Sequence, residues 1–315
     1  MPSSLIVRRQ GTKPEFIRHL ERNGLFGSVV SVEHIQELKG EIASLHRNGL
    51  LDEDFFHEYE RPYFTPRLPR NFSDAKSIIV VATPQPMLRT TFYWKGEARR
   101  LVVPPTYFDG QAVTSRARRL LIEGFRPRSY RLVRATLPLK LLAVRSGLAL
   151  YGKNNISYIP KHGSFHRLTA FYSDYPSHVD FWREKRALPL CSKCTACFRA
   201  CPTGAIQKER FLIKAERCLT YRNEKNSDEG FPGWVPASAH NSLVGCMRCQ
   251  RACPYDKKVL DWYVDRGVFS EDETAYLLRG KFSGARGVKM TAKLRRVGLD
   301  PSNISRNLEA LLRPM

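Results

Sequence analysis

The chain has 315 residues, of which 42% are hydrophobic, so it can bury the core of one large domain or two modest ones. No run approaches the roughly 18 apolar residues of a membrane-spanning helix, so we expect no membrane-spanning segment. The formal net charge of +22 favours partners that carry phosphate or carboxylate groups, such as a nucleic acid, a cofactor or an acidic redox protein.

Helical and strand patterns alternate between about residues 30 and 180. Helices are expected where apolar residues repeat every three or four positions, and strands where short apolar runs lie between turn-forming residues. In chain order these are a helix at 31–49, strands at 77–82 and 101–103, helices at 111–123 and 137–150, and strands at 156–159 and 168–172. A capping box at 270–273 opens a further helix, and a last helix is expected at 303–312. Such alternation predicts an α/β (α+β) layer domain.

Four segments are predicted along the chain. They are an N-terminal extension at 1–30, an α/β cobalamin-binding layer domain at 31–185, a ferredoxin-like double 4Fe-4S domain at 186–260 and a short helical C-terminal segment at 261–315. Arg8 and Arg9 have no apolar run behind them, so no export signal is expected and a cytoplasmic location is predicted.

All eight cysteines lie between residues 191 and 253, at spacings that iron–sulfur clusters need. The first run is C-x-x-C-x-x-C-x-x-x-C-P, a lone cysteine follows, and the second run is C-x-x-C-x-x-x-C-P. In two-cluster ferredoxins the fourth cysteine of each run ligates the other cluster. The rule predicts one 4Fe-4S cluster on Cys191, Cys194, Cys197 and Cys253, and a second on Cys201, Cys218, Cys246 and Cys249.

Two other uses of the cysteines explain the pattern less well. Structural zinc could occupy Cys-x-x-Cys pairs, but it would explain neither the third cysteine of the first run nor the two Cys-Pro endings. A disulfide framework is typical of small secreted domains, and no secretory signal is visible. Electron transfer is therefore the first functional hypothesis.

Basic residues are concentrated in two regions. Residues 111–173 contain twelve Lys or Arg against the single acid Glu123, and residues 278–315 contain nine against Asp300 and Glu309. Such a field attracts the phosphates of a nucleic acid or a cofactor, or an acidic electron donor. Ordinary solvated basic faces are the alternative explanation.

The cysteine block resembles that of the epoxyqueuosine reductases and, more remotely, that of the reductive dehalogenases. The likeness is dense at 191–206, 218–221 and 245–254, and it extends to residues 145–154 upstream and 306–312 downstream. The resemblance implies an oxidoreductase in which two 4Fe-4S clusters pass electrons from a flavodoxin- or ferredoxin-type donor to a bound cobalamin. In that family the substrate is a modified nucleoside in tRNA, so tRNA is a candidate partner here.

The resemblance also implies a cofactor pocket, because residues 145–154 are similar to the segment that lines cobalamin in that family. The expected cofactor-binding residues are Tyr151, Gly152, Lys153, Asn154 and Asn155. A glycine lets the backbone approach the macrocycle, a lysine can pair with its phosphate, and amides can bond its side chains. An ordinary helix-to-strand connection would explain the glycine and asparagines equally.

The family's acidic proton donor is missing from the comparable stretch at 134–140, which contains no carboxylate, and Asn154 stands where the family has a histidine. Tyr107, Tyr158 and His162 are therefore the candidate catalytic proton donors, with His166 as a further candidate. A structural hydrogen-bonding role is the alternative for each.

Two further functions stay open from the sequence. The chain could be a non-catalytic two-cluster ferredoxin-type electron carrier, or an RNA-binding protein whose clusters are structural. A cobalamin site would distinguish the enzyme from the carrier, and salt-insensitive RNA binding would eliminate the third function. The sequence does not identify the substrate, the physiological donor or the oligomeric state.

Overall fold

The computed structural model describes residues 13–63, 68–178, 180–209 and 211–312. Residues 1–12 of the expected N-terminal extension, which include Arg8 and Arg9, therefore lie outside the described residues. Within the described part, none of the helices combines the length and the hydropathy of a membrane span.

The first sheet has the strand order β1-β2-β8-β5, and all its neighbours run antiparallel. Its strands are β1 (Phe26–Ser31), β2 (Ser77–Pro84), β5 (Leu132–Arg134) and β8 (His166–Ser173). Successive residues of β2 face opposite sides, so Ile78 and Val80 belong to one core whereas Ile79 belongs to another. Both faces of the sheet are therefore buried, which explains why β2 is an unbroken apolar run.

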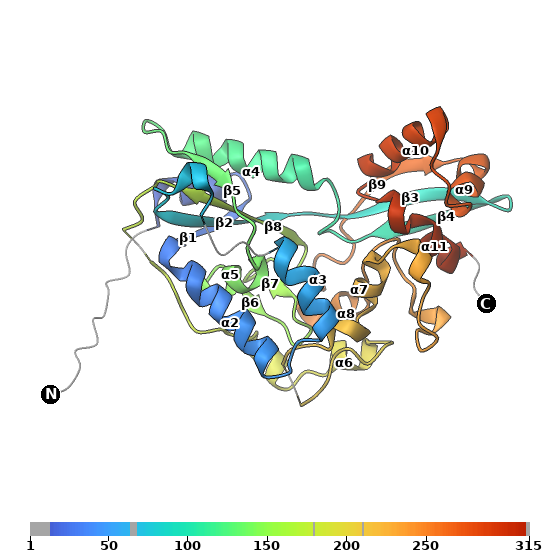
Figure 1. The fold of residues 1–315 in the computed structure, drawn as a ribbon, viewed down its shortest axis with the longest axis horizontal. Coiled ribbons are helices and arrows are strands. Elements are labelled where there is room, and N and C mark those ends of the chain that lie inside the picture. The colour runs from blue at the N-terminus through green and yellow to red at the C-terminus, as the bar shows by residue number, and fades with distance from the viewer. Residues whose placement is uncertain (1–12, 64–67, 179, 210, 313–315) are drawn as a thin grey trace.

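Helices cover both faces of this sheet (Figure 1). On one face lie α2 (Ile35–Arg47) and α5 (Leu139–Arg145). On the other face α1 (Glu15–Arg22) packs against α4 (Gly110–Gly124). The mixed helix-and-sheet class is confirmed, with an antiparallel sheet at its centre. Residues 15–30, which were expected to belong to the N-terminal extension, contribute α1 and most of β1 to this layer because their apolar side chains face its core.

A second sheet has the order β4-β3-β9. It consists of β3 (Met87–Trp94), β4 (Glu97–Val103) and β9 (Tyr263–Phe269), and β3 pairs antiparallel with β4 but parallel with β9. Its core is shared with α9 (Glu271–Leu278), α10 (Gly284–Arg296) and α11 (Pro301–Leu312). The segment from 261, expected to be helical, thus also contains a strand, because β9 buries Phe269 against Phe92 with ring centroids 4.6 Å apart.

The two sheets are joined where β2 ends and β3 begins. There Gln85 N donates to Phe165 O and Met87 N donates to Trp262 O, each at 2.9 Å. The cysteine-bearing segment lies between β8 and β9 in sequence and below the junction of the two sheets in the view of Figure 1. Its helices are α6 (Ala196–Ala200), α7 (Leu219–Glu224) and α8 (Arg248–Arg251).

Most of the predicted elements are confirmed, and one helix is shorter than expected. The helix predicted over 137–150 ends at Arg145, because Gly147 adopts a φ of 73° that stops it. A short hairpin of β6 (Leu150–Tyr151) and β7 (Ser157–Tyr158) follows. Helix α3 (Glu53–Tyr63) was not predicted.

Candidate iron–sulfur centre

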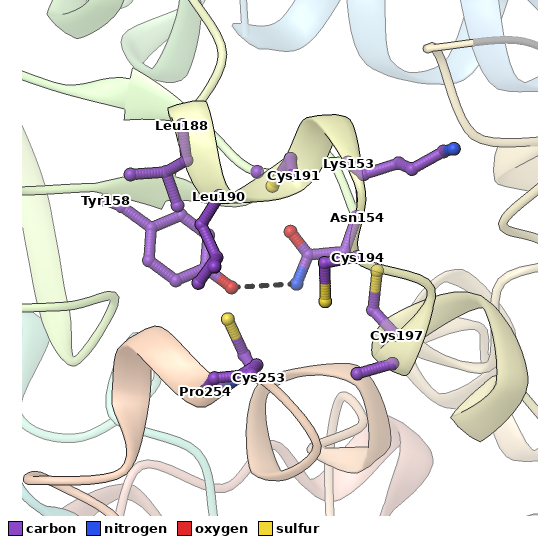
Figure 2. A pocket seen from close by; sticks show the side chains of 12 residues that line it. Lys153, Asn154, Tyr158, Leu188, Leu190, Cys191, Cys194, Cys197, Cys253 and Pro254 are labelled. Atoms are coloured by element: carbon purple, nitrogen blue, oxygen red, sulfur yellow. Dashed lines mark hydrogen bonds between the residues drawn. The ribbon is translucent and has the colours of Figure 1, made fainter.

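Four of the cysteines line one small pocket (Figure 2). Cys191 and Cys194 precede α6 and Cys197 lies in its first turn, whereas Cys253 follows α8. The pKa of the Cys197 thiol is raised to about 11, first by burial and then by the other three sulfurs of the pocket. The fold thus brings together the four cysteines that the ferredoxin spacing rule groups on one cluster.

The other four cysteines form a second group. Burial raises the pKa of the Cys218 thiol, and Cys246 and Cys201 add to that effect. The pKa of Cys249 is also raised by burial first and then by Cys246 and Cys218. Thiolates gathered in such a place need nearby positive charge to be stable, which the iron of a cluster supplies.

All eight thiols are free, so the structure contains none of the disulfides of a disulfide framework. The sulfurs of the first group line the wall of a pocket, as ligands of a larger inorganic core do.

Polar side chains also reach the cysteine sulfurs. Asn241 Nδ2 donates to Cys246 Sγ at 3.2 Å, and Asn241 is held in place because its Oδ1 accepts from Met247 N at 2.9 Å. Thr203 Oγ1 lies 3.7 Å from Cys201 Sγ. Such contacts orient metal ligands and adjust the electronic properties of the group they bind.

The five residues predicted to bind cobalamin lie beside the first cysteine group. Gly152, Lys153 and Asn154 line its pocket, and Tyr151 is buried. Asn155 adopts a φ of 57° and accepts a hydrogen bond from the backbone of the cysteine-bearing segment at 3.0 Å. Glycine is required at 152, since a Cβ there would lie 2.4 Å from Asn154 Oδ1. Contact of these residues with cobalamin stays a prediction.

Two of the candidate proton donors lie close to the cysteines. The Tyr107 hydroxyl donates to the Glu224 carboxylate, and the Tyr107 ring lies against Gly245, the residue before Cys246. Tyr158 is fully buried in the pocket of the first group. Burial raises the pKa of the Tyr158 phenol, so the hydroxyl keeps its proton.

The two histidine candidates have other surroundings. His162 is exposed, and its ring packs on Phe26 with centroids 4.2 Å apart. His166 is buried, its Nε2 lies 3.0 Å from Ser157 Oγ, and burial lowers its pKa to about 4. A catalytic role for any of the four candidates stays a prediction.

Sequence reasoning did not single out Lys140 and Glu224. Lys140 is open to solvent, yet enough protein surrounds it that desolvation lowers its pKa, while Cys218 and Glu224 act in the opposite direction. The lysine therefore lies near both the second cysteine group and the carboxylate that holds Tyr107. The sequence did offer one indication of Lys140. It belongs to the stretch 134–140, which was compared above with the segment that holds the acidic proton donor of the epoxyqueuosine reductases.

Comparison with known proteins agrees with this description. Residues 190–256 match the family described as "4Fe-4S double cluster binding domain". An epoxyqueuosine reductase of Synechococcus sp. (strain CC9605) is 32% identical over 121 residues, which are 38% of this chain and 36% of that protein. The match thus spans about a third of the length of that relative.

Two solved structures share the fold. One is epoxyqueuosine reductase from Bacillus subtilis, with its catalytic aspartate loop swung out of the active site (TM-score 0.64, 22% identity, 95% of this chain and 80% of that chain). The other is an epoxyqueuosine reductase with an epoxyqueuosine-modified tRNA stem loop (TM-score 0.63, 22% identity, the same coverage). The predicted double 4Fe-4S domain and the predicted resemblance to the epoxyqueuosine reductases are therefore confirmed.

Proposed function

We propose that this chain is a cytoplasmic iron–sulfur oxidoreductase of the epoxyqueuosine reductase type, in which two 4Fe-4S clusters pass electrons to a bound cobalamin. The observation that carries the proposal is the division of the eight cysteines by the fold, above all the position of Cys253 in the pocket of the first run. The names of the sequence relatives support a reductive reaction.

Electrons would enter at the first cluster. Cys191 and Cys194 are partly accessible to solvent, and the exposed Lys193 lies between them. A positive charge at this point suits an acidic flavodoxin- or ferredoxin-type donor, because opposite charges steer the encounter of the two proteins. The second cluster would then receive the electrons from the first.

Cobalamin, when bound, would supply a strongly reduced cobalt centre. Of the five residues predicted to contact it, Lys153 fits best, because its side chain is directed away from the cysteine sulfurs (Figure 2) and can reach a phosphate. The side chains of Asn154 and Asn155 are engaged with Tyr158 and with Ile213 N. Those two asparagines therefore shape the segment, and the backbone at Gly152 permits close approach.

Reductive loss of an oxygen consumes protons as well as electrons, so the chain needs a proton source. Tyr107 is the favoured candidate, because Glu224 holds its hydroxyl and Lys140 adds a positive charge nearby. Tyr158 is committed to the cysteine pocket, and His162 is packed on a residue of β1.

The substrate would be carried by tRNA. A structural neighbour is described with a tRNA stem loop, and this chain carries a net charge of +22. Exposed arginines on and after α4 offer a surface for phosphates: Arg116, Arg118, Arg119, Arg126 and Arg128.

Anaerobic metal analysis tests the proposal. Protein supplied with iron, sulfide and cobalamin is expected to contain about eight irons per chain, as two cubanes require, together with one cobalt and the absorption of a bound corrinoid. Iron at that level without corrinoid binding would favour the electron carrier. Zinc in place of iron would contradict both functions.

A further inference from the structure

Helix α11, which lies beside α7 (Figure 1), carries a buried arginine whose partners are backbone carbonyls. Arg306 is 9% exposed, and the Phe231 ring lies 4.3 Å from its Cζ. Its guanidinium donates to three carbonyl oxygens, which belong to Arg222 at 2.8 Å and to Lys225 and Asn226 at 2.9 Å. These carbonyls lie at and just beyond the end of α7, where a helix leaves acceptors without partners. The fork of the guanidinium satisfies several of them at once, so it binds the end of α7 to α11.

The next residue of α11, Asn307, joins two parts of the chain around the second cysteine group. It is 1% exposed, and its Nδ2 donates to Asn223 O at 2.8 Å and to Leu243 O at 3.0 Å. Its Oδ1 accepts from the preceding arginine at 3.2 Å. Leu243 N in turn donates to Val102 O of β4 at 2.8 Å. The chain that leads to Cys246 is therefore held between β4 and α11.

A third buried side chain connects the surroundings of two cysteines. Asn223 is 0% exposed and lies in α7, which begins directly after Cys218. Asn223 Nδ2 donates at 2.6 Å to the carbonyl of Gly245, the residue before Cys246. Ser242 Oγ donates to the same carbonyl at 3.1 Å. The chain after Cys218 and the chain before Cys246 are thus fixed relative to each other.

We propose that Arg306 and Asn307 are positioning residues for the second cluster, which hold the chain at Cys218 and the chain at Cys246 at the separation that one cluster requires. We call this pair the clamp. In the described part of the chain its side-chain bonds reach residues between 222 and 243 and none of the first cysteine run. Metal ligands bind well only when the surrounding bonds hold them in place, so the clamp acts on the second cluster alone. The proposal rests on the proposed cluster ligands and does not depend on cobalamin.

The test is iron analysis and the paramagnetic signals of variants reconstituted anaerobically. Asn307→Asp keeps the size of the side chain but replaces both amide donors by an oxygen that the facing carbonyls repel. We expect iron to fall from about eight to about four per chain. The signal that Cys218→Ala removes is expected to disappear, and the signal that Cys191→Ala removes is expected to stay. Arg306→Lys keeps the charge and loses the fork, so the same selective loss is expected.

Ser305→Ala is the matched control on the same helix. Ser305 is 8% exposed, and its side chain faces Gly280, which follows α9, and not the chain of the second cysteine group. This variant is expected to keep about eight irons and both signals. Wild-type iron content tests the proposed function separately, because the clamp predicts only the difference between the variants and the wild type.

Two results would overturn the clamp. One is about eight irons with both signals unchanged in the Asn307→Asp and Arg306→Lys proteins, and the other is loss of both clusters from folded protein. If circular dichroism shows that these variants do not fold, Asn223→Ser tests the link from α7. It removes the donor to Gly245 O and leaves α11 unchanged. It must then remove the signal of the second cluster alone, and any other outcome refutes the proposal.

Discussion

Cys253 belongs to the second cysteine run in sequence but lines the pocket of the first run in space. In two-cluster ferredoxins the last cysteine of each run ligates the cluster of the other run. The grouping of Cys253 with the first run was therefore predictable from the sequence. The contact of Tyr107 with Glu224 was not predictable, because these residues are 117 positions apart and meet only after distant segments have packed. Their residue types alone are equally compatible with ordinary turns and buried hydrogen bonds.

Replacement of Cys253 tests the grouping directly. Cys253→Ala is expected to remove the same cluster signal as Cys191→Ala and to reduce iron from about eight to about four per chain. Cys201→Ala is the matched control, since that cysteine also ends its run before a proline, and it is expected to remove the other signal. Identical residual spectra for the Cys253 and Cys246 variants would contradict the grouping.

His166 makes the stability dependent on pH. Burial lowers its pKa from 6.5 to about 4, so in that range the unfolded chain binds a proton that the folded protein does not. Stability contributed by the neutral imidazole is present above pH 6.5 and is lost as the pH falls. Between about pH 7 and pH 5 the loss is about 2 kcal/mol.

Urea unfolding of His166→Asn at both pH values measures this effect. The variant is expected to lose less stability on acidification than the wild type. His162→Asn serves as the control because the His162 ring is exposed. An unchanged pH dependence in the His166 variant would show that the acid sensitivity arises elsewhere.

At the scale of elements, the local sequence patterns predicted most helices and strands, but they did not predict which distant strands pair. β2, α4 and α9 follow from an apolar run, a helical period and a capping box. β3 and β9 pair with residues that are distant in sequence, and the pairing made a strand of a segment that was expected to be helical. Helix α10 was missed because its sequence is mostly polar and few of its side chains are buried.

The capping box of α9 should contribute measurably to stability. The Ser270 side chain accepts from Glu273 N, and the Glu273 carboxylate accepts from Ser270 N. Ser270→Ala is expected to lower the free energy of unfolding by about 1 kcal/mol, measured by urea denaturation. Ser283→Ala is the matched control, since Ser283 precedes α10 without a side-chain capping bond. Equal losses in the two variants would argue against the cap.

At the scale of the whole molecule, charge is distributed unevenly over the two faces of the first sheet. Helix α4 and the loop after it carry a row of exposed arginines, and α4 lies on the face opposite to α2. Phosphate binding releases counterions, so the affinity of such a face for RNA depends on salt. If tRNA is the partner, the α4 face is where we expect its backbone to lie.

Charge reversal on α4 tests this expectation. The double variant Arg118→Glu/Arg126→Glu is expected to weaken tRNA binding and to reduce the slope of log affinity against log salt by roughly two, one for each lost contact. The control Lys39→Glu/Arg47→Glu makes the same charge change on exposed positions at α2. Equal weakening by both variants would indicate attraction by net charge alone.

The parallel pairing of β3 with β9 also has a consequence for the order of folding. Paired residues of these strands, such as Arg89 and Asp265, are 176 positions apart or one more, and the whole cysteine-bearing segment lies between them. Closing so long a loop is slow, so the second sheet is expected to form late. Cluster assembly would tie the intervening chain together and shorten the effective loop. The rate at which the second sheet forms would then depend on the supply of iron. In a chain without iron, β9 would pair with β3 more slowly and Phe269 would stay unburied for longer.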